Sequence, residues 1–240
     1  MSSYTGIDNL EVMREAANYN RFLVDLVTSN ARREDRIVDF GAGAGTFASP
    51  VQAAGYDVCC VENDATLNAH LAGLGLPVHD DLARFDDDSV DYLYSLNVLE
   101  HIADDAAVVD LWFRKLRPSG RVLVYVPAFE LLFSSMDRKV GHHRRYRLRG
   151  LTETLRASGF AIQHARYADS LGFLATLLFK SIGSASGDID RGALRFYDRA
   201  LFPISRALDL LVGAMVGKNV YVVAVKPVLG DGQAAPQTPA

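Results

Sequence analysis

The feature that most limits the fold of this chain is the alternation of short apolar runs with helical stretches. The runs RIVDF, DVCCV, VDYLYS and RVLVYVP predict β-strands, and PVH predicts a shorter one. The stretches between them space their apolar residues as a helix does, for example Val108, Leu111 and Trp112 on one face. Strands that alternate with helices favour a mainly parallel sheet with both faces covered. The sequence therefore predicts an α/β domain.

The rest of the chain extends this domain. Two further strands are expected in FAIQHARYA and NVYVVAVKP, which bring the sheet to seven. Residues 170–217 are apolar and helical, and they form an insertion before the last strand. A chain of 240 residues with 49% hydrophobic residues can bury the core of one domain, which we assign to residues 1–229. Residues 230–240 are rich in Gly, Pro, Ala and Gln and are expected to be disordered.

Charge and cysteine content exclude several classes of function. A net charge of −4 gives no general attraction for nucleic acid, so we expect no nucleic-acid partner. Cys59 and Cys60 are adjacent, so they cannot join distant segments and lack the spacing of metal ligands. The opening stretch MSSYTGIDNLEVMREAANYN has neither a basic leader nor an apolar signal region. We therefore expect a protein of the reducing cytoplasm.

Three glycines stand close together in DFGAGAG, directly after the first predicted strand. Glycine permits a tight turn there and lets a ligand lie against bare backbone at the start of the next helix. Glu62 ends the following strand, where an acidic side chain can accept hydrogen bonds from the hydroxyls of a ribose. Together the two features predict a ligand that contains a nucleoside.

The spacing of these glycines separates two classes of enzyme. A dinucleotide-binding turn needs Gly-x-Gly-x-x-Gly, whereas Gly41, Gly43 and Gly45 alternate and Thr46 stands in the place of the third glycine. An NAD-type oxidoreductase is therefore the weaker alternative. A binding module without catalysis is a third class, and no motif supports it.

Five motifs follow one another in order along the chain: VDFGAGAGTF, VEND, HDDL, LNVLEHI and LRPSGRVLVYVPA. With these motifs in this order and spacing, the region from about Ile37 to Phe160 resembles the class I, Rossmann-like methyltransferases that use S-adenosylmethionine. The resemblance implies a Rossmann-like, mostly parallel seven-stranded sheet flanked by helices. It also implies S-adenosylmethionine as the methyl donor and S-adenosylhomocysteine as its product.

The resemblance further implies a set of cofactor-binding residues. The set is Asp39, Gly41, Ala42, Gly43, Glu62, Asn63, Asp80, Asp81, Leu82, Asn97 and Val98. The glycine turn would line the amino-acid part of the cofactor, and Asp39 would face its ammonium group or order the turn. Glu62 would hold the ribose hydroxyls, and Asn97 with Val98 would lie beneath the methionine arm. The aspartate doublet in HDDL would contribute one contact to the adenine amine, for which we favour Asp81.

The stretch MDRKVGHHRRYRLRG is expected to be a polar, basic loop. It resembles the string Asp-Arg-x-x-Gly-His-x-Arg-Arg-Tyr of a subgroup of these enzymes, and we predict that Arg144, Arg145 and Tyr146 bind the substrate. Arginine suits bidentate recognition of a carboxylate or phosphate on an acceptor. Ordering of the loop against acidic side chains and a simple solvated face are the alternatives.

An acceptor hydroxyl or nitrogen that carries a proton must lose it, and a histidine can speed that step by roughly 10²- to 10⁴-fold. The candidates are His101, His142 and His143, of which His142 matches the subgroup string better. His101 could instead cap or support the helix that follows it. Glu100 and the ADD stretch add carboxylates, which hard cations prefer. Acidic residues also suit a helix N-terminus, however, and we predict no metal.

The apolar insertion leaves the acceptor and the assembly state open. LGFLATLLF is too short to span a bilayer, which takes about 20 apolar residues. Along the next helix, one face carries Leu201, Ile204, Leu208, Leu211 and Met215. It would be a lid, a homodimer surface or a peripheral membrane contact, of which we favour the first two, in a monomer or a homodimer. We predict methylation of a hydroxyl or nitrogen on a small metabolite or natural product, and a lipid-linked or sugar acceptor is the alternative.

Overall fold

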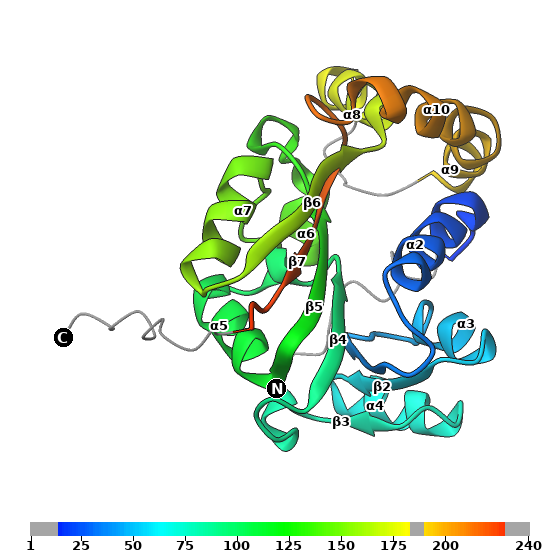
Figure 1. Cartoon of the computed structure of the whole chain (residues 1–240). Helices are drawn as coiled ribbons and strands as arrows, with labels where there is room; N and C mark the ends of the chain where they lie inside the picture. The colour runs from blue at the N-terminus through cyan, green and yellow to red at the C-terminus, as the bar shows by residue number, and fades with distance from the viewer. Residues whose placement is uncertain (1–13, 183–189, 229–240) are drawn as a thin grey trace.

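The computed structural model describes residues 14–182 and 190–228, and it confirms the predicted sheet. Seven strands are hydrogen-bonded in the order β3-β2-β1-β4-β5-β7-β6 (Figure 1). The strands are β1 (Arg36–Phe40), β2 (Asp57–Val61), β3 (Val78–His79), β4 (Val90–Leu96), β5 (Leu116–Pro127), β6 (Ala161–Ala168) and β7 (Asn219–Val225). The pairs from β3 to β5 are parallel, whereas β7 is antiparallel to both β5 and β6. This is a Rossmann-like α/β fold.

Helices cover both faces of this sheet. They are α2 (Ala17–Ser29), α3 (Ala48–Ala53), α4 (Ala65–Gly73), α5 (Asp105–Lys115), α6 (Ser135–Val140), α7 (Leu148–Ala157), α8 (Ser170–Ile182), α9 (Arg191–Phe196) and α10 (Phe202–Val212). One core cluster joins the sheet to α5 and α7 through Trp112 and Leu151. The other joins it to α2 and α3 through Leu23 and Val51. All four side chains are fully buried, so the strands have apolar contacts on both sides.

The predicted helical insertion lies between β6 and β7. It contains α8, α9, a π-helical turn (Tyr197–Leu201) and α10, and it gathers above one end of the sheet (Figure 1). Two buried carboxylates fasten it: Asp198 accepts two backbone N–H groups from the start of α2, and Asp209 accepts two from the junction of β6 and α8. Among the described residues, no helix combines the length and apolarity needed to cross a bilayer.

The prediction of an unbroken loop after β5 is wrong, because α6 lies within it. Ser134 precedes this helix, and its backbone N–H donates to the Asp137 carboxylate over 2.8 Å. Gly141 ends the helix with a φ of +82°, a left-handed conformation that glycine adopts without strain. The pair Ser134 and Asp137 is a sequence signal for a helix start. The many charged residues around this pair favoured the prediction of a loop instead.

The strand β5 begins at Leu116, five residues before the predicted run RVLVYVP, so it includes RPSG. The backbone N–H of Ser119 donates to the Lys226 carbonyl, and the Lys226 N–H donates to the Gly120 carbonyl, each over 2.8 Å. Lys226 directly follows β7, so these two bonds join RPSG to the end of a strand that is distant in the sequence. The tail at residues 230–240 lies outside the described residues.

Candidate functional site

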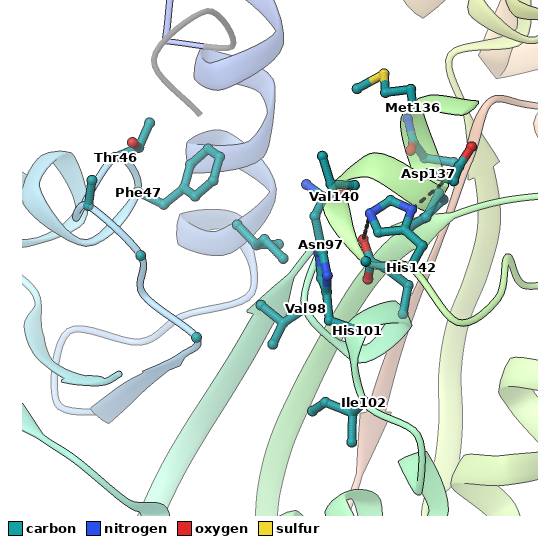
Figure 2. A pocket seen from close by; sticks show the side chains of 18 of the residues that line it. Thr46, Phe47, Asn97, Val98, His101, Ile102, Met136, Asp137, Val140 and His142 are labelled. Atoms are coloured by element: carbon teal, nitrogen blue, oxygen red, sulfur yellow. Dashed lines mark hydrogen bonds and ion pairs between the residues drawn. The ribbon is translucent and has the colours of Figure 1, made fainter. Parts of the chain in front are cut away.

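A cavity of about 2200 Å³ opens at the carboxyl ends of β1, β2 and β4. Ligands of open α/β sheets bind at this edge, where the strands end and their loops diverge. All eleven predicted cofactor residues line the cavity. The opposite wall comes from α6, α8 and α9, and Figure 2 shows the loops after β1 and β4 facing α6 across the opening.

The glycine loop after β1 has a backbone shape that other residues would strain. Gly41 and Gly43 have φ values of +79° and +55°. A Cβ at Gly41 would lie 2.4 Å from a methyl carbon of Val98, so this loop and the loop after β4 touch only because Gly41 has no side chain. A Cβ at Gly43 would meet nothing within 4 Å. Gly43 therefore exposes bare backbone to the cavity.

Glu62 is fixed at the end of β2 by two backbone donors. Its Oε2 accepts the N–H of Gly43 over 2.8 Å, and its Oε1 accepts the N–H of Asp64 over 2.9 Å. The side chain is 9% exposed and faces the cavity. Each carboxylate oxygen can accept more than one hydrogen bond, so Glu62 is held in place and can still bind a pair of hydroxyls.

Asp39 ends β1 and lies deeper than Glu62. Its side chain is buried and its Oδ2 accepts a hydrogen bond from the Tyr94 hydroxyl over 2.9 Å. Burial raises the pKa of Asp39 to about 7, although the bond from Tyr94 works in the opposite direction. Asp39 can therefore order the turn in its neutral form and attract an ammonium group in its charged form.

The two aspartates after β3 both reach the cavity with exposed side chains. Asp80 forms an ion pair with Arg84 over 3.2 Å. Asp81 accepts the N–H of Ala83 over 2.8 Å and thereby caps the short 3₁₀ turn that contains Leu82. Both carboxylates remain candidates for an adenine amine.

Asn97 forms the floor of the cavity after β4. Its φ of +56° is uncommon outside glycine, and asparagine is one of the residues that tolerates it. The Asn97 N–H donates to the Tyr125 carbonyl over 2.7 Å, which holds the loop to β5. Val98 contacts the glycine loop, so β1 and β4 are joined at their ends.

A cluster of titratable side chains borders the cavity beside Asn97. His101 and His142 meet edge to face with ring centroids 4.5 Å apart (Figure 2). Glu100 lies close to both rings and has no exposed surface. His142 Nδ1 lies 2.8 Å from an oxygen of Asp137, and its Nε2 lies 3.8 Å from Glu100 Oε1. The distance to Glu100 is too long for a hydrogen bond.

The surroundings of this cluster shift the pKa values of three members. Burial, together with the two histidines nearby, lowers the pKa of His101 to about 4. Burial raises the pKa of Glu100 to about 8. Burial alone would raise the pKa of Asp137 too, but hydrogen bonds from His142 and Arg145 outweigh it and hold that pKa well below its usual range. His101 is therefore neutral at pH 7, while Asp137 is charged.

The predicted substrate residues mainly hold the loop. Arg145 donates to both oxygens of Asp137 over 2.9 and 3.0 Å and is 7% exposed. Arg144 pairs with Asp105 over 2.9 Å, and the Tyr146 hydroxyl donates to the same carboxylate over 2.8 Å. Of these three predicted residues, Arg145 lines the cavity and the other two do not. Contact with substrate stays a prediction for Arg145.

His143 differs from the histidine before it, because it is exposed and does not line the cavity. Its backbone N–H donates to the Glu100 carbonyl over 2.8 Å and so ties the loop to the end of β4. The geometry favours His101 and His142 over His143 as groups that can meet an acceptor.

Two residues at the cavity escaped the sequence reasoning. Asp137 organises His142 and Arg145, and its position three residues after Ser134 was the available signal. Lys218, just before β7, lines the cavity, and burial lowers its pKa. No local motif marks Lys218, because only the pairing of β7 with β5 brings it to the cavity.

The family model of the methyltransferase domain matches residues 13–165 of the chain. This interval begins just before α2 and ends within β6. It therefore includes the glycine loop, Glu62, Asn97 and the histidine cluster, and it leaves out α8 to α10.

Curated relatives match parts of the chain. A protein of Mycolicibacterium smegmatis is 29% identical over 163 residues, which are 65% of this chain and 60% of that protein. Its name places it among the S-adenosylmethionine-dependent methyltransferases. The chain spans 36% and 60% of the length of the first two curated relatives that it matches.

Solved structures share the fold across nearly the whole chain. A chain solved in complex with the Haloferax volcanii Trm112 methyltransferase activator has a TM-score of 0.62 and 17% identity, with 95% of this chain and 99% of that one covered. Phosphoethanolamine N-methyltransferase 2 of Haemonchus contortus, solved with S-adenosyl-L-methionine, has a TM-score of 0.59 and 19% identity. That match covers 88% of this chain and 53% of the other. At such identities the likeness concerns the fold.

Proposed function

The chain belongs to the S-adenosylmethionine-dependent methyltransferase family, and from that premise we propose that it methylates a hydroxyl or nitrogen of a small-molecule acceptor. One observation carries the proposal: the bare backbone at Gly43, the fixed carboxylate of Glu62 and the histidine cluster border a single cavity. A donor site and an acceptor site that share one cavity suit direct group transfer.

The residues at the sheet edge fit the cofactor. The open space above Gly43 would take its amino-acid part, with Asp39 nearby as a counter-charge for the ammonium group. Glu62 would accept hydrogen bonds from the ribose hydroxyls, and one of the two aspartates after β3 would accept one from the adenine amine. Asn97 would support the methionine arm. When bound, S-adenosylmethionine supplies a methyl group on a strongly electrophilic sulfonium.

With such an electrophile, the protein has mainly to position the acceptor and to remove its proton. Orientation of the reacting groups in a closed site can contribute about 7–11 kcal/mol. The neutral imidazole of His101 and the imidazole of His142, which Asp137 orients, border the cavity beside Asn97. They are the groups on which we base the proposal of a hydroxyl or nitrogen acceptor.

A lipid-linked acceptor remains the second candidate, because apolar side chains are exposed on the insertion. Leu174, Leu178, Ile204, Leu208 and Leu211 are between 37% and 80% exposed on α8 and α10. Sedimentation with vesicles that contain anionic lipid tests this candidate. Retention on the vesicles would favour it, and a chain that stays in the supernatant would favour the water-soluble acceptor.

Calorimetry with S-adenosylhomocysteine and with NAD tests the proposed function. We expect binding of S-adenosylhomocysteine and none of NAD. Glu62→Gln should weaken that binding by roughly 10- to 100-fold, since a hydrogen bond to a charged group is worth about 1.5–3 kcal/mol. Glu153→Gln is the matched control, because Glu153 lies on α7 in an exposed pair with Arg149.

Two results would contradict the proposal. One is binding of NAD without S-adenosylhomocysteine, and the other is an unchanged affinity in Glu62→Gln. Transfer of labelled methyl in a panel of hydroxyl and nitrogen acceptors then separates an enzyme from a binding module.

A further inference from the structure

We propose that Glu100, His101 and His142 form a binding site for a divalent transition-metal ion of the Zn²⁺ type at the acceptor side of the cavity. One ligand atom from each residue lies within 4.8 Å of the others. All three side chains line the cavity, and Figure 2 shows His101 and His142 side by side at its edge. Two histidines and one carboxylate are a known ligand set for catalytic zinc, which leaves a fourth position open.

The state of Glu100 is the observation that most needs an explanation. Its side chain is completely buried, and neither carboxylate oxygen has a hydrogen-bond partner among the described residues. Protonation removes the charge but leaves an O–H group and an oxygen with nothing to bond. Buried polar groups without partners are rare and costly, with a penalty of about 1–3 kcal/mol each. A cation between Glu100 and the two imidazoles would satisfy the carboxylate directly.

Neighbouring side chains hold the His142 ring in place. His142 Nδ1 contacts Asp137, and Nε2 is directed at Glu100. The tautomer with its proton on Nδ1 leaves Nε2 able to bind a metal. Arg145 holds Asp137 from the other side, so the carboxylate that orients the imidazole is itself fixed. Such outer partners fix the orientation of ligand histidines in metal sites.

The ligand set in the structure differs from the group of acidic residues that are adjacent in the sequence. Asp104 and Asp105 follow His101 closely, but Asp104 caps α5 and Asp105 binds Arg144 and Tyr146. His142 comes from a distant loop and takes the third position. The expectation of no metal rested on the local stretch alone, so it did not include the residue that completes the site.

A metal here would change how the acceptor loses its proton, an inference that rests on the proposed function. An ion with an open position lowers the pKa of a hydroxyl that binds to it, so that the proton leaves to water and the oxygen becomes a better nucleophile. The methyl carbon then forms its bond to that oxygen as its bond to sulfur breaks. His142 Nε2 is a metal ligand in this arrangement, and it does not act as a base. The favoured acceptor is therefore a hydroxyl compound.

Metal binding can be measured without any acceptor. The full chain is stripped with a chelator, and Zn²⁺ is then added in a calorimeter and Co²⁺ in a spectrophotometer. We expect about one equivalent to bind, with visible Co²⁺ bands of a site that contains nitrogen ligands. Glu100→Gln and His142→Ala should each weaken binding at least tenfold, since even outer partners of ligands are worth about 10- to 100-fold. His164→Ala, at an exposed position on β6 outside the cavity, should leave it unchanged.

Each other outcome overturns a defined part of the proposal. Absence of saturable Zn²⁺ and Co²⁺ binding in a chain that binds S-adenosylhomocysteine removes the metal site and leaves the proposed function intact. Binding that survives both Glu100→Gln and His142→Ala places the ion elsewhere and also removes the site. Metal binding without S-adenosylhomocysteine binding would contradict the proposed function instead. Binding of S-adenosylhomocysteine by the variants checks that they are folded.

Discussion

The loop after β1 and the loop after β5 border the same cavity, yet they are stabilised in different ways. The first loop, residues 41–45, depends on its backbone: three glycines have positive φ, and the N–H groups of Gly41 and Gly43 donate to Val61 and Glu62. The second, residues 134–146, depends on charged side chains. Its centre is Asp137, which contacts both Arg145 and His142.

The difference reflects what each loop has to present to a ligand. A cofactor can approach the first loop closely because Gly43 adds no side chain there. The second loop places an imidazole beside Glu100, and a long side chain needs fixed partners to keep one orientation. Replacement of a glycine should therefore destabilise the first loop, and removal of a charged side chain should destabilise the second.

The largest effect is expected from Asp137→Ala in the second loop. Arg145 is almost completely buried and would lose the carboxylate that two of its three nitrogen donors contact. Removal of one partner of a buried ion pair typically lowers the free energy of unfolding by about 3–5 kcal/mol. Urea denaturation measures this loss. Glu153→Ala breaks an exposed pair and should change the same quantity by no more than about 0.5 kcal/mol. Equal losses in the two variants would show that the Asp137 network does not hold the loop.

Gly41→Ala should have the next largest effect and probes the first loop. Its new Cβ would meet Val98 at 2.4 Å, in addition to the strain of a φ of +79°. Gly75→Ala is the matched control, since Gly75 has a φ of +77° and open space around it. The clash should cost about 1–3 kcal/mol beyond the control in urea denaturation.

A Gly41→Ala variant as stable as Gly75→Ala would mean that the loops after β1 and β4 separate easily. Calorimetry with S-adenosylhomocysteine on both variants would then show whether cofactor binding depends on their contact.

The smallest effect is expected from the pH dependence of Asp39. Its pKa is about 7 in the folded chain against 3.8 for the ordinary group, so the unfolded chain loses this proton first as the pH rises. The folded state is therefore favoured below about pH 4 and loses that advantage as the pH rises to about 7. The slope is at most about 1.4 kcal/mol per pH unit.

Asp39→Asn should remove this decline, so its stability relative to the wild type should rise between pH 5 and pH 7. Urea denaturation at several pH values measures the trend, and Asp25→Asn on the exposed side of α2 serves as the control. Parallel pH profiles for the wild type and Asp39→Asn would refute the role of burial at this carboxyl group.

Much of the cofactor side could be predicted because its signals are local. The glycine turn and Glu62 each follow a strand whose residues are apolar, and carboxyl ends of parallel strands meet at one edge. Asn97 was implied only by the resemblance to the methyltransferase family. The periodicity of Val108, Leu111 and Trp112 likewise predicted α5, where Trp112 is fully buried. The acceptor side was less predictable. The basic stretch pointed to substrate arginines, whereas Arg144 and Tyr146 bind Asp105 and hold the loop.

The sequence by itself determined the α/β sheet, its seven strands and the edge at which a nucleoside ligand would bind. These follow from apolar periodicity and from glycine, which act over a few residues. Only the tertiary structure decided which charged groups neutralise one another and which face the cavity. Glu100 and His142 are distant in sequence, and their proximity depends on the packing of the loop after β5 against the end of β4. Electrostatic partners are set by distance in space and by burial, and neither is encoded in a local motif.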